Sequence, residues 1–194
     1  MRTYLIIAFS CLLFVDHAKG ASIFHFSSAP GSWIGQGQTL TFTDATTPFS
    51  THRYYSQGAY TNSVSIGAGG YELRMVAPNY SLPTVGFYDN ATRWPFMNNG
   101  AGMSFSGPGR GNNRLTGWFK VLQADYKPDG TIEAFAVDFT QYDEEFTSRW
   151  NRGAIRYNST IPIPEPGRLV FLTFGSIAVA TARRLGRVEC SRAA

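Results

Sequence analysis

Residues 21–157 consist of short runs in which apolar and polar residues alternate, and each run ends at glycine, proline, asparagine or serine. Successive side chains of a β-strand point to opposite faces, so this period of two predicts half-buried strands. The expected strands span residues 23–26, 40–43, 63–66, 71–75, 85–88, 103–105, 117–126, 131–140 and 153–157. No segment of this region has the longer apolar period of a helix.

The clearest unit is a predicted hairpin that joins residues 117–126 to residues 131–140. Its turn is Lys127-Pro128-Asp129-Gly130, in which proline fixes φ and glycine accepts a positive φ. On the second strand, Glu133, Phe135, Val137 and Phe139 are expected on one face, and Ile132, Ala134, Ala136 and Asp138 on the other. Because both faces are largely apolar, this strand is expected at the centre of a sheet. About nine strands indicate an all-β domain over residues 21–160, an antiparallel β-sandwich or jelly roll.

The N-terminus has the features of a secretion signal. Arg2 precedes an apolar run over residues 4–15, and a short polar stretch ends with the small residues Ala18 and Gly20. A first strand or a short anchor helix is the alternative, but the run is too short to span a bilayer comfortably. Residues 1–20 are therefore expected to form a signal helix, cut between Gly20 and Ala21 by signal peptidase after export through the Sec machinery.

The C-terminus changes abruptly from a strand-like to a membrane-like pattern. The proline-rich stretch 161–166 is followed by fourteen uncharged residues, 169–182, and then by Arg183, Arg184 and Arg187. The arginines predict a cytoplasmic end, with the preceding chain outside. As a helix, the apolar run would measure about 21 Å against a hydrocarbon core of about 30 Å, so Arg168 and Arg183 would have to snorkel. A buried helix with a basic end is the alternative.

This tail resembles the PEP-CTERM sorting domain of Gram-negative bacteria, which is also labelled the ice-binding protein C-terminal domain. The resemblance covers residues 161–187, with 188–194 as the tail end, and depends on Pro164, Glu165 and Pro166 followed by the apolar run and the arginine cluster. It implies recognition by an exosortase, processing near Pro164-Glu165-Pro166, transient anchoring in the inner membrane, and association with exopolysaccharide and biofilm matrix.

The middle of the chain resembles a family of exported bacterial β domains of unassigned function. The matching segments are 33–38, 109–111, 136–139 and 153–159. Members of that family often carry one cysteine after Gly-Arg-Gly and another after the Asp-Phe segment. Asn112 and Asp143 occupy those two places here, so the resemblance implies that they are neighbours in space.

Composition excludes several functions for the domain. Between residues 21 and 163 there are ten Lys or Arg and ten Asp or Glu, so no net charge favours nucleic acid. Cys11 and Cys190 both lie outside the domain, which excludes a disulfide or a cysteine-based zinc site within it. His25 and His52 are expected on a strand face or in a loop, the Gly107–Gly111 run as a loop rather than a phosphate site, and Asp143-Glu144-Glu145 as a solvated acidic turn. No catalytic residue, metal ligand or cofactor is predicted.

The remaining candidates are ligand contacts. Trp33, Trp94, Trp118 and Trp150 are candidates to stack on sugars, with packing in the core as the alternative. Trp33 and Trp94 are favoured because they lie in Gly-, Pro- and Asn-rich segments, and Arg110 and Arg114 are candidates to hold an anionic ligand. The predicted function is a non-enzymatic protein of the cell surface or extracellular matrix, associated with exopolysaccharide. The alternative is an extracellular carbohydrate-active enzyme that uses dispersed carboxylates such as Glu133 and Asp138. Two facing carboxylates in a cleft would favour the enzyme, and a flat exposed aromatic strip would favour binding.

Overall fold

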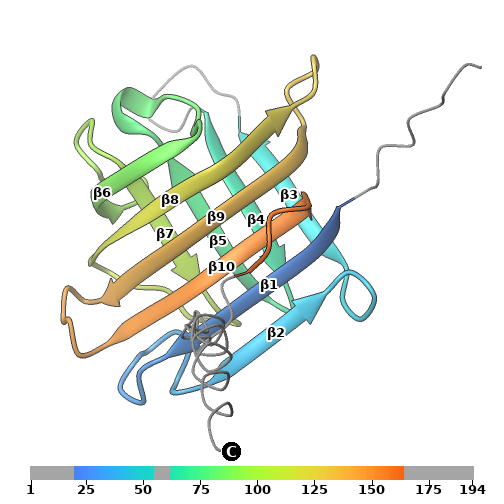
Figure 1. Ribbon diagram of the computed structural model, residues 1–194. Helices are drawn as coiled ribbons and strands as arrows, with labels where there is room; N and C mark the ends of the chain where they lie inside the picture. Colours follow the sequence, from blue (N-terminus) through green and yellow to red (C-terminus); the bar gives the residue numbers. More distant parts are fainter. Residues whose placement is uncertain (1–19, 55–61, 164–194) are drawn as a thin grey trace, which may run out of the picture. The chain divides into compact units, whose positions relative to one another are not determined.

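The computed structural model describes residues 20–54 and 62–163, which form ten strands and one short 3-10 helix (Figure 1). The elements are β1 (Ala21–Ser28), β2 (Thr39–Thr43), β3 (Phe49–Tyr54), β4 (Ser63–Ala68), β5 (Tyr71–Val76), η1 (Pro78–Tyr80), β6 (Gly86–Arg93), β7 (Gly102–Ser106), β8 (Leu115–Tyr126), β9 (Ile132–Asp143) and β10 (Trp150–Ser159). The predicted all-β class is confirmed.

All ten strands belong to one mixed sheet with the order β2-β1-β10-β9-β8-β6-β7-β5-β4-β3. Every neighbouring pair is antiparallel except β6 and β7, which pair in parallel through Thr92 with Gly102 and Arg93 with Met103. The prediction of a wholly antiparallel fold is therefore wrong at this pair. The overlap is confined to the end of β6 and the start of β7, so a loop over residues 94–101 suffices and no long crossover is needed.

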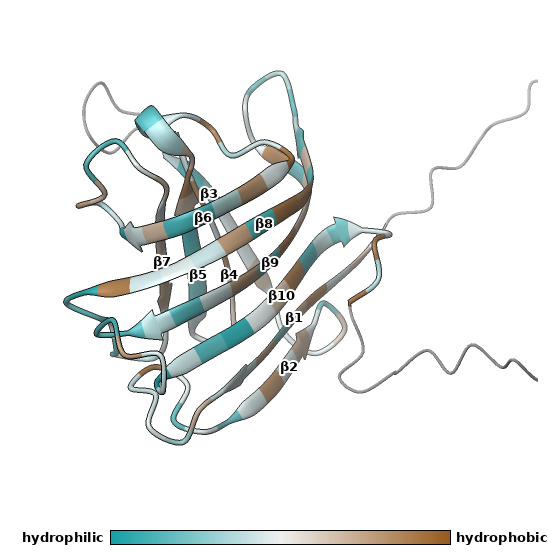
Figure 2. Ribbon diagram, turned by 60° about the vertical axis from the view of Figure 1, so that its left-hand side comes forward, coloured by the Kyte–Doolittle hydropathy of each residue, from teal (hydrophilic) through white to brown (hydrophobic). Residues whose placement is uncertain are grey.

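The sheet curls so that β7, β5, β4 and β3 lie behind the other six strands (Figures 1 and 2). Aromatic rings fill the space between the two halves. Phe26 of β1 lies 4.6 Å from Tyr71 of β5 between ring centroids, and Phe105 of β7 lies 5.1 Å from Phe139 of β9. Burial of such rings is the main contribution to the stability of a core of this kind.

Each of the nine predicted strands overlaps an observed one, and the hairpin between β8 and β9 is confirmed. Gly130 has φ of 83° and donates its N–H to Lys127 O at 2.7 Å. Strand β3 was not predicted, because this edge strand has few apolar residues and alternates between half-buried and exposed positions. The expected face of Glu133 is wrong: a register shift next to it turns Ile132 into the core and leaves Glu133 exposed.

The predictions for the two ends fall mostly outside the described residues. Ala21 is the first residue of β1, and Gly20 directly precedes it. Residues 1–19 and 164–194 are not described, so the two expected helices, the processing residues Pro164, Glu165 and Pro166, and the arginines Arg183, Arg184 and Arg187 stay predictions. Within the described ranges, no helix has the length and apolar character needed to cross a membrane.

Candidate ligand-binding face

Four aromatic side chains lie on the outer face of four neighbouring strands. They are Phe87 of β6, Trp118 of β8, Tyr142 of β9 and Trp150 of β10, and we call them the aromatic strip. Trp118 follows the buried Gly117 and precedes Phe119, which is fully buried, so the alternation of the strand turns Trp118 outward. The Phe87 and Trp118 ring centroids are 5.7 Å apart.

Strand register places the other two rings beside this pair. Tyr142 is opposite Thr116 on one side and Trp150 on the other, which is one diagonal step from Trp118. Phe87 is 59% exposed, and Trp118, Tyr142 and Trp150 are each half-buried. The strip therefore lies on the open face of a sheet rather than in a cavity.

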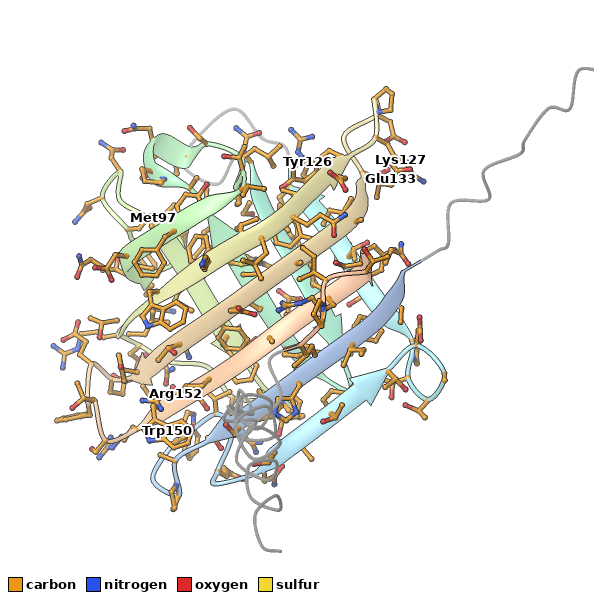
Figure 3. All side chains as sticks on the ribbon, viewed as in Figure 1. Met97, Tyr126, Lys127, Glu133, Trp150 and Arg152 are labelled. Atoms are coloured by element: carbon orange, nitrogen blue, oxygen red, sulfur yellow. The ribbon has the colours of Figure 1, made fainter. Side chains whose placement is uncertain are left out.

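Polar side chains line the strip. Arg152 lies across from Thr140 and places its guanidinium carbon 4.8 Å from the centroid of the Trp150 ring. Figure 3 shows Trp150 and Arg152 together near one end of β10. Lys120, exposed on β8, is opposite both Phe87 and Asp138. The face thus combines rings that can stack with donors that can bind oxygen atoms.

A hollow of about 670 Å³ opens where β6 ends and β8 begins. Its lining consists of Thr92, Arg93, Phe96, Met97, Asn98, Asn113, Arg114, Leu115 and Glu145, and we call it the arginine hollow. Arg93 Nη1 donates to Asn113 O at 3.0 Å, and its guanidinium carbon lies 5.0 Å from the centroid of the Phe96 ring. Met97, labelled in Figure 3, is buried at the base of the 94–101 loop.

Asp143 organises the loops at this end of the sheet. Its side chain is fully buried, so the prediction of a solvated acidic turn is wrong for this residue. The residue is the last of β9, and the strand's alternation directs it inward after Phe139 and Gln141. Within the Asp143-Glu144-Glu145 segment, Glu145 is exposed and Glu144 half-buried, so these two carboxylates contact solvent and Asp143 does not.

Hydrogen bonds compensate the buried carboxylate. Asp143 Oδ1 accepts from the side-chain amides of Asn112, Asn151 and Gln141 at 2.7, 2.8 and 3.2 Å. Its Oδ2 accepts from the backbone N–H groups of Trp33 and Ile34 at 2.8 and 3.2 Å, and the Ser32 hydroxyl lies 2.7 Å from it. We call Ser32, Asn112, Gln141, Asp143 and Asn151 the polar knot. Five N–H groups and one hydroxyl therefore surround the two carboxylate oxygens, so neither oxygen is left without a hydrogen-bond partner.

The polar knot joins segments that are far apart in sequence. It connects residues 32–34 of the β1–β2 loop and Asn112 of the β7–β8 loop to the ends of β9 and β10. The predicted proximity of Asn112 and Asp143 is confirmed by their direct hydrogen bond. The knot therefore fixes the backbone next to the aromatic strip and the arginine hollow.

The four predicted ligand residues fall in three places. Trp33 is 55% exposed, and Arg110 Nε donates to Ile34 O at 3.2 Å, so these two lie on adjoining loops. Arg114 lines the arginine hollow. Trp94 does not line the arginine hollow, and its ring centroid lies 4.3 Å from the guanidinium carbon of Arg74 on β5.

The sequence analysis included Trp118 and Trp150 among the stacking candidates but favoured Trp33 and Trp94. It missed Phe87, and it did not place Tyr142, Trp118 and Trp150 together with Phe87 on one face. The sequence could indicate such residues only by their outward position in an alternating strand. Of the four, only Trp118 lies in a predicted strand whose alternation is clear, that over residues 117–126. Which strands are neighbours could not be read from the pattern, and the strip exists only because β6, β8, β9 and β10 are adjacent.

The carboxylates required by the enzymatic alternative do not face each other across the arginine hollow. Glu133 lies at the far end of β9, near Lys127 in Figure 3. Asp138 Oδ1 accepts from Arg156 Nη2 at 2.8 Å. Neither residue lines the arginine hollow. His25 Nδ1 contacts Thr41 Oγ1 at 2.8 Å, which places that histidine on a strand face as expected.

Two ionisable groups next to the turn between β8 and β9, Tyr126 and Asp129, have shifted pKa values. Hydrogen bonds from the backbone and side chain of Thr131 lower the pKa of Asp129, which supports the charged form of this turn residue. Burial raises the pKa of the Tyr126 phenol above its usual value of 10.0, while nearby Arg53 opposes the shift. The Tyr126 hydroxyl donates to Pro83 O at 2.8 Å.

The raised pKa of Tyr126 predicts a specific loss of stability at high pH. Above pH 10 the unfolded chain releases this proton while the folded chain retains it, so the unfolded state is favoured as pH rises. Tyr126→Phe removes the titration, and also the hydrogen bond to Pro83, worth about 1 kcal/mol. The stability advantage of the wild type over the variant should be constant between pH 7 and 9 and shrink from pH 10 to 11. Urea unfolding at each pH measures it, and a gap that does not shrink would contradict the burial effect.

Comparison of this chain with protein-family models, with curated proteins and with solved structures finds no match in any of the three.

Proposed function

We propose that this chain is an exported, non-enzymatic protein of the cell surface or extracellular matrix, and that its β domain binds polysaccharide through the aromatic strip. The observation that carries the proposal is the set of four aromatic side chains on adjoining strands, with Phe87 more than half exposed. Exposed rings gathered on one face of a soluble domain are a common mark of a binding site.

The strip suits a sugar chain for two reasons. The faces of a pyranose ring carry C–H groups, which pack on the flat surface of Trp, Tyr or Phe, whereas its edge carries hydroxyls. Arg152 and Lys120 next to the rings can donate hydrogen bonds to those hydroxyls. A flat strip across strands accommodates an extended chain better than an isolated small molecule, which usually requires an enclosing pocket.

The two ends of the sequence support the location. A secretion signal over residues 1–20 and a PEP-CTERM-like tail over residues 161–187 would deliver the domain across the inner membrane, anchor it transiently, and release it through an exosortase. We propose further that the two halves of the curled sheet pack face to face in the manner of a β-sandwich, with the outer face of the front half as the ligand surface. Mass spectrometry of the mature protein would report both cuts, and an N-terminus at Met1 would oppose export.

A carbohydrate-active enzyme remains the second candidate. Such an enzyme needs two carboxylates placed on either side of a glycosidic bond, roughly 5–10 Å apart. Asp138 is engaged with Arg156, and Glu133 lies at the hairpin end, so these two residues offer it little support. Release of reducing ends from a bound polysaccharide would favour the enzyme over the binding protein.

Trp118→Ala tests the binding face. Affinity gel electrophoresis in gels containing cellulose derivatives, xylan or polygalacturonate should show that at least one polymer retards the wild-type protein. The variant should bind that polymer about tenfold more weakly, since losing one stacking contact of about 1.4 kcal/mol changes the affinity by that factor.

Trp33→Ala is the matched control, because Trp33 is an exposed tryptophan outside the aromatic strip. It should leave the retardation unchanged. Loss of binding in Trp33→Ala with none in Trp118→Ala would move the site to the loops, and no retardation by any polymer would oppose the proposed function.

A further inference from the structure

The arginine hollow has a net positive charge, which stacking of sugars on the aromatic strip does not require. Two guanidinium groups, Arg93 and Arg114, and one carboxylate, Glu145, line it, so the lining has an excess of one positive charge. Phe96, 62% exposed, provides an apolar wall beside the two cations. Cations next to an exposed ring suit a ligand with both a charged group and an apolar face.

The two arginines differ in how firmly they are held. Arg93 is fixed by its bond to Asn113 O and by the Phe96 ring, and Asn113 N–H in turn donates to Glu144 Oε1 at 2.7 Å. Arg114 is 69% exposed, and its Nη1 lies 3.8 Å from Glu145 Oε2. An exposed ion pair at this distance is worth little, so an incoming anion can compete with Glu145 for Arg114.

Amide groups complete the lining. Asn98 and Asn113 are exposed at the hollow, and within residues 20–54 and 62–163 their side-chain amides form no hydrogen bond. Each amide offers both a donor and an acceptor to a ligand. The hollow therefore combines one fixed cation, one adjustable cation and polar groups of both kinds.

Strand register connects the hollow to the aromatic strip. Thr92 lines the hollow and is opposite Thr116, which is opposite Tyr142, and Tyr142 is opposite Trp150. These four residues form one row across β6, β8, β9 and β10. Adjacent strands are about 4.8 Å apart, so Thr92 and Tyr142 are separated by about 10 Å. A chain lying on the strip can thus reach the hollow.

We infer that the arginine hollow binds the carboxylate of a uronic acid unit, and that the polysaccharide recognised by this domain is anionic. The inference rests on the proposed polysaccharide function and names its ligand class. Arg93 and Arg114 pair with the carboxylate, for which a guanidinium offers parallel N–H donors. Phe96 packs against the face of the same sugar, and the Asn98 and Asn113 amides bind its hydroxyls.

A matched pair of polymers tests the charge requirement. Isothermal titration of the purified full chain with polygalacturonate oligomers, and with the same oligomers after reduction of their carboxyl groups, should give at least tenfold tighter binding for the carboxylated form. Raising the salt concentration should reduce this preference, because the contact is ionic and exposed. Equal affinity for the two forms would overturn the inference and leave the proposed function standing.

Variants then locate the charge contact. Arg114→Gln should remove most of the preference for carboxylated over reduced oligomers, whereas Trp118→Ala should weaken both to a similar degree. Arg149→Gln is the matched control, because Arg149 is an exposed arginine outside the hollow. A preference that survives Arg114→Gln, or that falls equally in Arg149→Gln, would overturn the assignment to the hollow.

Two further outcomes bear on the ligand class. Tighter binding of sulfated oligomers than of carboxylated ones of equal length would overturn the carboxylate assignment. Failure of both the carboxylated and the reduced oligomers to bind, together with no retardation by any polysaccharide, would overturn the proposed function and this inference together.

Discussion

Replacement of Asp143 by asparagine is expected to lower the free energy of unfolding by about 3–5 kcal/mol. In the wild type, Oδ1 and Oδ2 of Asp143 both accept, and five N–H groups and a hydroxyl point at them. Asparagine has the same shape, but one oxygen becomes an NH₂ group. Whichever way the amide is turned, donors then face donors in a site with no access to water. Urea unfolding followed by tryptophan fluorescence measures the change.

Glu145→Gln provides the comparison for this prediction. It makes the same chemical change two residues along the chain, at an exposed side chain whose contact with Arg114 is long, and should change the free energy of unfolding by less than about 0.5 kcal/mol. A loss below 1 kcal/mol in Asp143→Asn would mean that the polar knot contributes little to stability.

Arg156→Met is expected to cost about 3 kcal/mol. Among the residues that the structure describes, Arg156 is the largest fully buried side chain, at 1% exposure, although it lies on the outer face of β10. Its Nη1 donates to Val137 O and Ile155 O, each at 3.0 Å, its Nη2 pairs with Asp138, and its Nε and Nη2 both donate to Pro162 O. Methionine fills much of the volume but donates to none of these oxygens. The same unfolding experiment measures the loss.

Two further variants separate the ionic contact from the rest. Arg152→Met removes an exposed arginine from the same strand and should cost under about 0.5 kcal/mol. Asp138→Asn combined with Arg156→Met in a double-mutant cycle should show a coupling of about 1 kcal/mol or more, because the pair is direct and mostly buried. Additive losses would indicate that the carbonyl contacts, rather than Asp138, hold Arg156.

The sequence predicted those parts of the fold that depend on neighbouring residues. The alternation within residues 117–126 and 131–140, with the Pro-Asp-Gly turn between them, predicted the β8–β9 hairpin. Local pattern also predicted seven other strands. It could not predict β3, since Phe49 and Tyr54 are the only large apolar residues of this edge strand, nor the register shift that reversed Ile132 and Glu133.

The candidate site was less accessible, because it depends on pairings between distant segments. Asp143 appeared to belong to an acidic turn, and only the approach of Ser32 and Asn112, 111 and 31 residues away, makes it a buried centre. The resemblance to exported β domains did predict the contact with Asn112. In the same way, nothing local indicated that Phe87 would lie beside Trp118.

The position of Arg156 has a mechanical consequence. Trp150, in the aromatic strip, begins β10, and Arg156 near its other end holds Pro162, two residues before the Pro-Glu-Pro sequence. The same strand therefore connects the ligand face to the segment that leads into the tail. A load along β10, applied at Pro162 and resisted by a ligand held on β8 and β9, would be shared among the hydrogen bonds of the β9–β10 ladder, which runs from Trp150 to Tyr157.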